Sequence, residues 1–160
     1  MHQEISWPTE KCALYELLAS QAKALSDGCP PISALSNVAS LLWEALPDIN
    51  WAGFYIMEDG RLVLGPFQGK TACIRIPVGK GVCGTAVKEN ATQRVADVHA
   101  FPGHIACDCA SRSEIVVPIH VNGEIWGVLD IDSPYVGRFT QEDQRGLEKI
   151  VTIIENCLER

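Results

Sequence analysis

The sequence lacks both long apolar runs and clusters of basic residues. No apolar segment approaches the roughly 20 residues that a membrane-spanning helix needs, so we expect no membrane partner. The 13 Lys and Arg residues are scattered and outnumbered by 20 Asp and Glu, for a formal charge of -7; this balance argues against nucleic acid as a partner. The segment 1–12 has no basic stretch leading into an apolar run, so we expect no secretory signal and a cytoplasmic location.

The chain also lacks repeats, low-complexity stretches and linkers, so its 160 residues favour a single domain over 1–160. Thr9 is expected to cap a first helix, and Thr140 with Asp143 resembles a capping box for the last one. Apolar residues at helical spacing predict helices over 9–27, 33–46 and 140–160. Shorter apolar segments predict six strands, over 50–57, 61–67, 71–77, 93–98, 114–121 and 124–132.

Helices at both ends with strands between them predict an α+β fold. We expect a central antiparallel sheet of about six strands, with the terminal helices packed on one face and loops covering the other. The strongest hairpin signal is Asn122-Gly123 between the last two strands. The glycine-rich segment 78–90 predicts a loop that opens into a short helix. Loops that cover a sheet are a common place for a ligand pocket.

Seven cysteines are conspicuous in a chain expected to be cytoplasmic, where thiols serve more often as small apolar residues, metal ligands or redox groups than in structural disulfides. Four lie in or beside loops near one end of the expected sheet: Cys73, Cys83, Cys107 and Cys109. Zinc is disfavoured because no Cys-x2-Cys pair is present, the spacing from Cys107 to Cys109 being too tight and that from Cys73 to Cys83 too wide. We expect no metal and no bound cofactor.

Thiol redox chemistry is the second interpretation of these cysteines. A reactive thiol needs a lowered pKa, which nearby positive charge or a helix N-terminus provides. Cys107 has His104 and Arg112 close to it in sequence, and Cys83 lies where 78–90 turns into a helix, which favours its thiolate. Taken alone, these residues fit redox cysteines and inert loop cysteines equally well.

Three carboxylates lie near the same loops. Asp130 and Asp132 are two residues apart on a strand and therefore share a face, where mutual repulsion raises one pKa and leaves an acid that can donate a proton. The alternative is a strand that simply leaves the core for solvent. Glu114 begins the partner strand, but an ideal turn at Asn122-Gly123 would place it opposite Ile131 and on the other face. If all three carboxylates share a pocket, the hairpin must contain a bulge or an odd-length loop.

Trp51 and Tyr55 are four residues apart on an expected strand and share a face. Aromatic residues in this position usually belong to the core. They could instead form the wall of a cavity for a small apolar or methyl-bearing group, beside carboxylates that hold an ammonium.

Several longer motifs resemble those of one enzyme family. "LVLGPFQGKTACIRIPVGKGVCGTA", "VHAFPGHIACDCASRSEIVVPI" and "GVLDIDSP" are similar to segments of the free methionine-R-sulfoxide reductases, which are built on a single GAF domain. The resemblance extends from about Leu14 to the final helix. It implies the GAF fold, with an antiparallel sheet and terminal helices on one face.

The resemblance also implies roles for individual residues. Cys107 would be the nucleophile, Cys73 its disulfide partner, and Cys83 a third functional or recycling cysteine; Cys109 is a bystander or an alternative disulfide partner. The implied pocket residues are Trp51, Tyr55, Glu114, Asp130 and Asp132. One of the three carboxyl groups would activate the sulfoxide oxygen and the others would bind the substrate amino group, with backbone N–H groups near 78–84 holding its carboxylate.

The implied reaction is reduction of free L-methionine-(R)-S-oxide through a cysteine sulfenic acid and an intramolecular disulfide. An external thioredoxin system, fed by NADPH, would regenerate the thiols, and a homodimer is implied by the family alone. The remaining alternatives are a GAF domain that senses a small molecule without catalysis and a cysteine-based redox sensor. A sensor of the first kind needs none of the three cysteines.

Overall fold

The computed structural model describes residues 5–104 and 110–159, and its elements follow the predicted order. The helices are α1 (Lys11–Ser26), α2 (Pro31–Ala45), α3 (Gly81–Glu89) and α4 (Gln141–Leu158). The strands are β1 (Trp51–Glu58), β2 (Arg61–Gly69), β3 (Arg75–Pro77), β4 (Gln93–Val95), β5 (Ser113–Val121) and β6 (Glu124–Ser133). A 3-10 turn, Val98–Ala100, follows β4.

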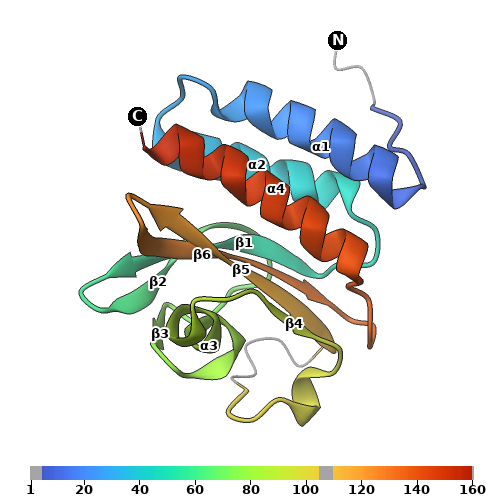
Figure 1. Ribbon diagram of the computed structural model, residues 1–160. Helices are drawn as coiled ribbons and strands as arrows, with labels where there is room; N and C mark the ends of the chain where they lie inside the picture. The colour runs from blue at the N-terminus through green and yellow to red at the C-terminus, as the bar shows by residue number, and fades with distance from the viewer. Residues whose placement is uncertain (1–4, 105–109, 160) are drawn as a thin grey trace.

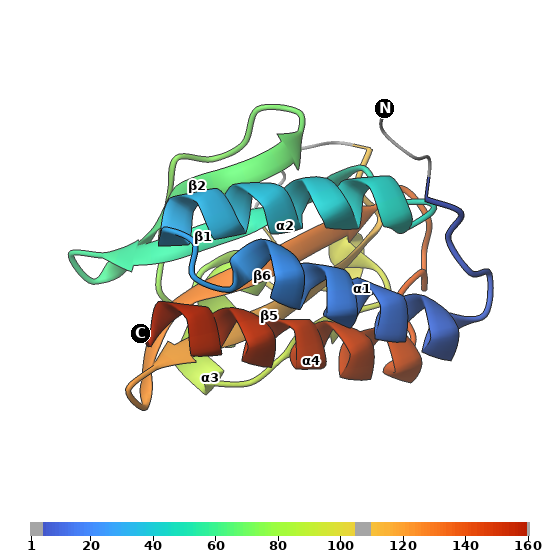
Figure 2. The ribbon, with the colours of Figure 1, turned by 90° about the horizontal axis from the view of Figure 1, so that it is seen from above.

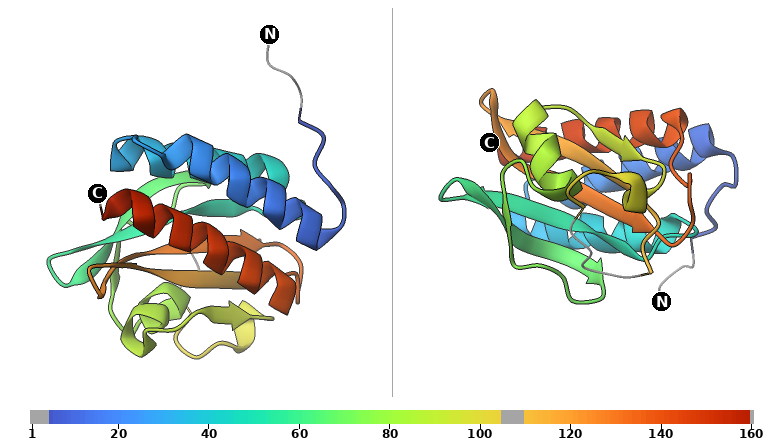
Figure 3. Two further views of the ribbon diagram at one scale, coloured as in Figure 1. Left: turned by 45° about the horizontal axis from the view of Figure 1, so that its top comes forward. Right: turned by 90° about the horizontal axis from the view of Figure 1, so that it is seen from below.

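The six strands form one antiparallel sheet in the order β3-β2-β1-β6-β5-β4. The three long helices cover one face (Figure 1): α2 packs on β1 and β2, α4 packs on β5, and α1 lies above the groove between them (Figure 2). The shorter α3 lies on the opposite face, against β5 and β6 (Figure 3). The predicted α+β fold with terminal helices on one face is therefore confirmed.

The alternation of side chains along the central strands separates two apolar layers. On β1, Ala52 and Phe54 face the long helices, while Trp51 and Tyr55 face α3. The larger layer, under the helices, includes fully buried Leu18, Leu42, Phe54, Ile131 and Leu147. The smaller layer under α3 leaves room for polar side chains, and it contains the site described below.

The predicted hairpin turn at Asn122-Gly123 is present, and a second two-residue turn joins the first two strands. Asp59 and Gly60 join β1 to β2, and Asn122 and Gly123 join β5 to β6; all four have positive φ angles between 53° and 81°. Two-residue turns with positive φ at both positions match the right-handed twist of paired strands, which is why Asn-Gly and Asp-Gly favour them.

Several element boundaries differ from those predicted. Glu10, and not Thr9, caps α1, since its carboxylate accepts bonds from the N–H groups of Cys12 and Ala13 at 2.8 Å. α2 begins at Pro31 because proline suits the first position of a helix, whose N–H has no intrahelical partner. The capping box of α4 is confirmed, with Asp143 accepting from the N–H of Thr140 at 2.8 Å.

The expected strand over 71–77 is reduced to the three residues of β3, at the edge of the sheet. Within 5–104 and 110–159, no helix is both long and apolar enough to cross a membrane.

Candidate active site

A small cavity of about 40 Å³ lies between α3 and the sheet, on the face opposite the long helices. Its walls bring together residues from β1, α3, β5 and β6, including all five pocket residues expected from the sequence: Trp51, Tyr55, Glu114, Asp130 and Asp132. Cys83 lies in the same wall. The structure thus places one predicted thiol and three predicted carboxylates in one enclosed space.

A bulge in β6 brings the carboxylates onto one face. His120 pairs with Ile125 next to the turn, but Ile119 pairs with Gly127, so Trp126 is an extra residue in β6. The register beyond it shifts by one, and Glu114 pairs with Asp132. The condition set by the sequence, a bulge if all three carboxylates share a pocket, is therefore met.

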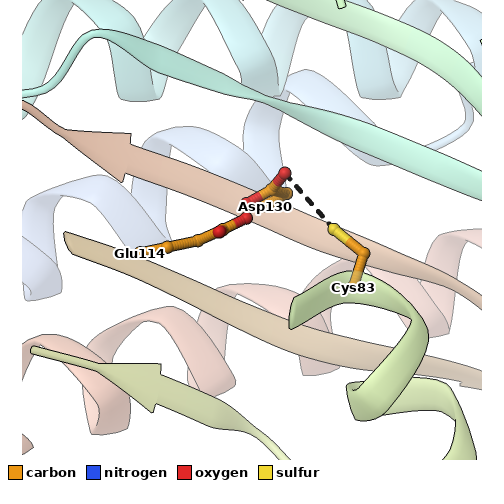
Figure 4. A group of neighbouring side chains, drawn as sticks. All are labelled: Cys83, Glu114 and Asp130. Atoms are coloured by element: carbon orange, nitrogen blue, oxygen red, sulfur yellow. Dashed lines mark hydrogen bonds between the residues drawn. The ribbon is translucent and has the colours of Figure 1, made fainter. Parts of the chain in front are cut away.

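Two of the carboxyl groups and the thiol are withdrawn from solvent, while Asp132 is half-buried. Glu114 is 8% exposed, Asp130 5% and Cys83 4%. The thiol of Cys83 donates to Oδ2 of Asp130 at 3.3 Å (Figure 4). A buried carboxylate is costly unless donors surround it, so the protonation of these groups decides what the site can do.

Glu114 is the group that holds a proton. Burial raises its pKa well above the ordinary range, and repulsion from Asp130 and Asp132 raises it further. Burial also raises the pKa of Asp130, but hydrogen bonds from Glu114 and Cys83 counteract that effect. The arrangement favours a neutral Glu114 that donates to an ionised Asp130, a division of roles that closely placed carboxyl groups commonly adopt.

The thiol of Cys83 differs from the sequence expectation. The start of α3 was expected to favour its thiolate, yet burial raises its pKa well above the ordinary value, and the negative charge of the neighbouring aspartates, Asp130 first, adds to the effect. The fixed partial charge of a helix N-terminus is only about half a unit, and it is outweighed here. Cys83 is a protonated hydrogen-bond donor in this structure.

Glycines position the start of α3 against the sheet. Gly81, its first residue, has a φ of 62°, which disfavours other residues. A Cβ atom on Gly84 would lie 2.4 Å from the carbonyl oxygen of Pro77. This close approach sets the turn of α3 that carries Cys83 over β6.

The aromatic wall is rigid. Trp51 stacks on Tyr55 and on Phe67, with ring centroids 5.9 and 5.2 Å apart, and its Nε1–H donates to the carbonyl of Lys70 at 3.1 Å. The hydroxyl of Tyr55 donates to the carbonyl of Cys73 at 2.9 Å. The wall is thereby joined to the segment that contains Cys73.

The other cysteines divide into two groups. Cys73 is disulfide-bonded, whereas Cys12, Cys29 and Cys157 lie on or beside α1 and α4, away from the cavity. The predicted nucleophile Cys107, and Cys109, fall outside the described residues.

His104 lines the cavity, but burial and the neighbouring His99 lower its pKa, so it does not supply the positive charge expected from the sequence. Arg112 is exposed.

Three polar residues of the cavity were not expected from the sequence: Thr71, Lys80 and Ser111. Lys80 precedes the first residue of α3, and the glycine-rich segment around it was the only available signal. Ser111 accepts a hydrogen bond from the Asn50 side chain at 3.1 Å, a contact between residues far apart in sequence that no local pattern indicates.

Comparison with known proteins agrees with this geometry. The model of the GAF domain family matches residues 9–158, so fold and site define a GAF-domain protein with a thiol in its pocket. Free methionine-R-sulfoxide reductase of Escherichia coli K12 is 62% identical over 127 residues, covering 79% of this chain and 77% of that protein. Free methionine-R-sulfoxide reductase of Saccharomyces cerevisiae is 47% identical, covering 98% and 93%.

A solved structure of the free methionine-R-sulfoxide reductase of Neisseria meningitidis, in complex with its substrate, superimposes with a TM-score of 0.94 at 41% identity, covering 99% of this chain and 96% of that one. The chain belongs to the free methionine-R-sulfoxide reductases of the GAF domain family.

Proposed function

We propose that this protein reduces free L-methionine-(R)-S-oxide to L-methionine with cysteine thiols, within a single GAF domain over 1–160. The observation that carries the proposal is the buried contact between a carboxylic acid, Glu114, and the Asp130–Cys83 pair, beside the aromatic wall of Trp51 and Tyr55. The names of the relatives support the substrate.

A sulfoxide is a weak electrophile until its oxygen is protonated or strongly hydrogen-bonded. The neutral Glu114 is the acid of the site, because its raised pKa keeps a proton available near neutral pH. In the proposed step, the thiolate of Cys107 attacks sulfur while Glu114 protonates the oxygen. An S–S bond forms, the S–O bond breaks and the oxygen leaves as water. A water molecule then attacks the Cys107 sulfur, the S–S bond breaks, methionine leaves and Cys107 becomes a sulfenic acid, with one proton consumed overall.

The second step forms a disulfide. The thiol of Cys73 attacks the sulfenic acid and releases water, giving a Cys73–Cys107 disulfide. Two observations support this pairing: Cys73 is disulfide-bonded, and Cys83 is a buried thiol bonded to Asp130. Cys83 then acts as a hydrogen-bond donor that holds Asp130 ionised, and Cys109 is the alternative partner that the test below must exclude.

Recognition of the free amino acid follows from the charges. Asp130 and Asp132 bind the substrate ammonium, backbone N–H groups at the start of α3 bind its carboxylate, and the aromatic wall holds the S-methyl end. A methionine within a peptide lacks these free charges and would leave buried polar groups unpaired. Binding such a substrate is therefore strongly disfavoured.

Turnover needs an external dithiol that reduces the disulfide. We assign this role to a thioredoxin-like protein supplied by NADPH, in the cytoplasm, as part of the response to oxidative stress. The protein itself binds no cofactor in this scheme. A homodimer is proposed from the family resemblance alone.

The test is turnover of free L-methionine-(R)-S-oxide by the purified protein with a thioredoxin system. The S epimer and the N-acetylated R epimer serve as comparison substrates, and Cys107→Ser, Cys73→Ser and Cys109→Ser as variants. We expect turnover of the free R epimer only, lost in Cys107→Ser, blocked after one turnover in Cys73→Ser and retained in Cys109→Ser. A folded, reduced protein that turns over no sulfoxide would instead be a GAF sensor.

A further inference from the structure

Cys83, Glu114 and Asp130 hold three potential metal ligands close together, although they come from α3, β5 and β6. The sulfur and one oxygen of each carboxyl group all lie within 4.8 Å of one another, and Figure 4 shows the three side chains converging. The sequence contains no Cys-x2-Cys pair, and for that reason a zinc site was not expected. A thiol and two carboxyl groups brought together by the sheet register were outside that pattern.

The dimensions of the cluster fit a small tetrahedral ion. Zinc–sulfur bonds of about 2.3 Å and zinc–oxygen bonds of about 2.0–2.2 Å place neighbouring ligands roughly 3.5 Å apart. Cys83 Sγ and Asp130 Oδ2 are already 3.3 Å apart. A rotation of the Glu114 side chain is the adjustment that remains, since no pair of ligand atoms is farther apart than 4.8 Å.

A second observation points to a ligand in the cluster. Oδ1 of Asp130 is buried, on a side chain that is only 5% exposed, and among the described residues its only possible hydrogen-bond partners are neighbouring carboxyl groups. A buried carboxylate oxygen requires either a proton from a neighbour or a cation. The proton of Glu114 meets this need in the metal-free protein, and a bound cation would replace it.

We propose that Cys83, Glu114 and Asp130 form an inhibitory zinc site inside the cavity. A thiolate with two carboxylates suits a borderline ion such as zinc, whereas magnesium and calcium take oxygen ligands only. His104 lines the same cavity, and it or a water molecule occupies the fourth position. Binding releases the protons of Cys83 and Glu114 as the zinc bonds form.

The consequence for function rests on the proposed reductase activity. Zinc at this site would remove the acid Glu114 and the ammonium-binding Asp130, so it competes with the substrate. It would also cover the sulfur of Cys83 and protect it from oxidation. The site therefore couples turnover to the supply of free zinc.

Direct binding tests the site without reference to activity. Zinc is titrated into the full-length protein against a chelator of known affinity, in the disulfide form and after full reduction. We expect one ion per chain in both forms, because Cys73 is disulfide-bonded here while the thiol of Cys83 is present. Zinc that binds only after reduction would overturn the proposal, since it would point to the other thiols.

Variants locate the ligands. Cys83→Ser and Asp130→Asn should each weaken zinc binding by more than about 100-fold, because loss of an outer-shell contact alone costs about 10–100-fold. Cys12→Ser, which removes an exposed thiol on α1, is the matched control and should bind as the wild type does. Cobalt in place of zinc should give a sulfur-to-metal charge-transfer absorption that Cys83→Ser loses. If Cys83→Ser and Asp130→Asn both bind zinc with unchanged affinity, the proposed zinc site is wrong.

Inhibition is then measured separately. The apparent inhibition constant of zinc should rise with substrate concentration, as expected for a competitor. Extrapolated to zero substrate, it should match the dissociation constant measured by direct binding. Zinc that binds at the cluster without slowing turnover would overturn the inhibitory role. If the protein turns over no sulfoxide, the binding experiments still show whether zinc binds at Cys83, Glu114 and Asp130. A failure of the reductase proposal can therefore be told apart from a failure of the zinc-site proposal.

Discussion

Glu114 on β5 lies directly opposite Asp132 on β6, and this pairing exists because Trp126 bulges out of the ladder and has no partner in β5. Without the bulge, Glu114 would pair with Ile131 and its side chain would lie in the apolar layer under the long helices. Whether this one residue next to the turn is paired or bulges out therefore decides whether the cavity contains an acid.

Deletion of Trp126 should straighten β6 and keep the site. Trp126 is the β6 residue that has no partner in β5, so in its absence Gly127 still pairs with Ile119 and Glu114 stays opposite Asp132. We expect the deletion variant to keep most of its turnover, as Trp126→Ala should. Circular dichroism and the melting temperature check that the sheet persists. A folded deletion variant that loses about 100-fold in turnover, the contribution of a positioned acid, would contradict this register.

Glu114→Gln should lower activity and raise stability at high pH. The amide cannot protonate the sulfoxide, so kcat for the free R epimer should fall about 100-fold or more. The raised pKa of Glu114 means that the folded state binds its proton more tightly than the unfolded state does.

This contribution to wild-type stability is complete below the unfolded pKa of glutamate. It is lost as pH rises towards the folded pKa, at up to about 1.4 kcal/mol per pH unit. Urea unfolding of Glu114→Gln and wild type across this range should show the variant gaining relative stability as pH rises. A constant difference would mean that Glu114 is ionised in the folded protein.

Cys83 should resist alkylation in the folded protein. Its thiol is buried and its pKa is raised, so almost no reactive thiolate is present at neutral pH. Timed labelling with iodoacetamide followed by mass spectrometry should modify the exposed Cys12 first, and Cys83 only when urea unfolds the chain. Equal labelling rates in the folded state would show that Cys83 is an activated thiol, as the sequence suggested.

Tyr55→Phe should loosen the segment that carries Cys73. The change removes a hydrogen bond of 2.9 Å to the Cys73 carbonyl, worth about 1 kcal/mol. We expect a lower melting temperature and slower disulfide formation in single-turnover experiments, with the stacking on Trp51 kept. Tyr135→Phe is the matched control because Tyr135 is 58% exposed, and it should change neither quantity.

Asp143→Ala should destabilise the helix layer. Asp143 is 1% exposed and accepts bonds from Tyr15 and Lys11 at 2.7 Å each, together with a longer one from Arg138. Removing it leaves these donors unpaired, so we expect a loss of about 3 kcal/mol in urea unfolding. Glu142→Ala, next to it and exposed, should stay within about 0.5 kcal/mol of the wild type.

The same carboxylate predicts acid sensitivity. Burial raises the pKa of Asp143, but the bonds from Lys11, Thr140 and Tyr15 and the charge of Arg138 outweigh burial, so the net shift is downward. Its contribution is therefore present above the unfolded pKa of aspartate and is lost as pH falls through the lower folded pKa. Between these values the stability difference between wild type and Asp143→Ala should shrink; a difference independent of pH would contradict this origin.

Local patterns were sufficient for most of the fold. Helical spacing located α1, α2 and α4, and the Asn122-Gly123 pair located the β5–β6 turn, because these signals depend on neighbours in sequence. The cap of α1 was assigned one residue early, since Thr9 and Glu10 both carry suitable oxygens and only the backbone path selects between them.

The site was less predictable for a physical reason. The identity of the pocket residues came from motif resemblance, and the cavity brings them together. The protonation of Cys83 depends on Glu114 and Asp130, whose distance from it is set by the β6 bulge and by the packing of α3. The alternation of apolar and polar residues around Trp126 does not indicate that this residue bulges. The spacing of residues alone therefore could not show that the three carboxyl groups share a face, or that they raise the pKa of the Cys83 thiol.

The pairing of Trp51 with Asp132 has a consequence for how the chain folds. One wall of the cavity is on β1 and the other on β6, and they meet only after most of the chain has been synthesised. Contacts between residues so far apart in sequence close slowly, because the loop entropy is lost before the contact stabilises. A nascent chain that ends before β6 would expose the apolar faces of β1 and α2, so the cavity is among the last parts of the protein to form.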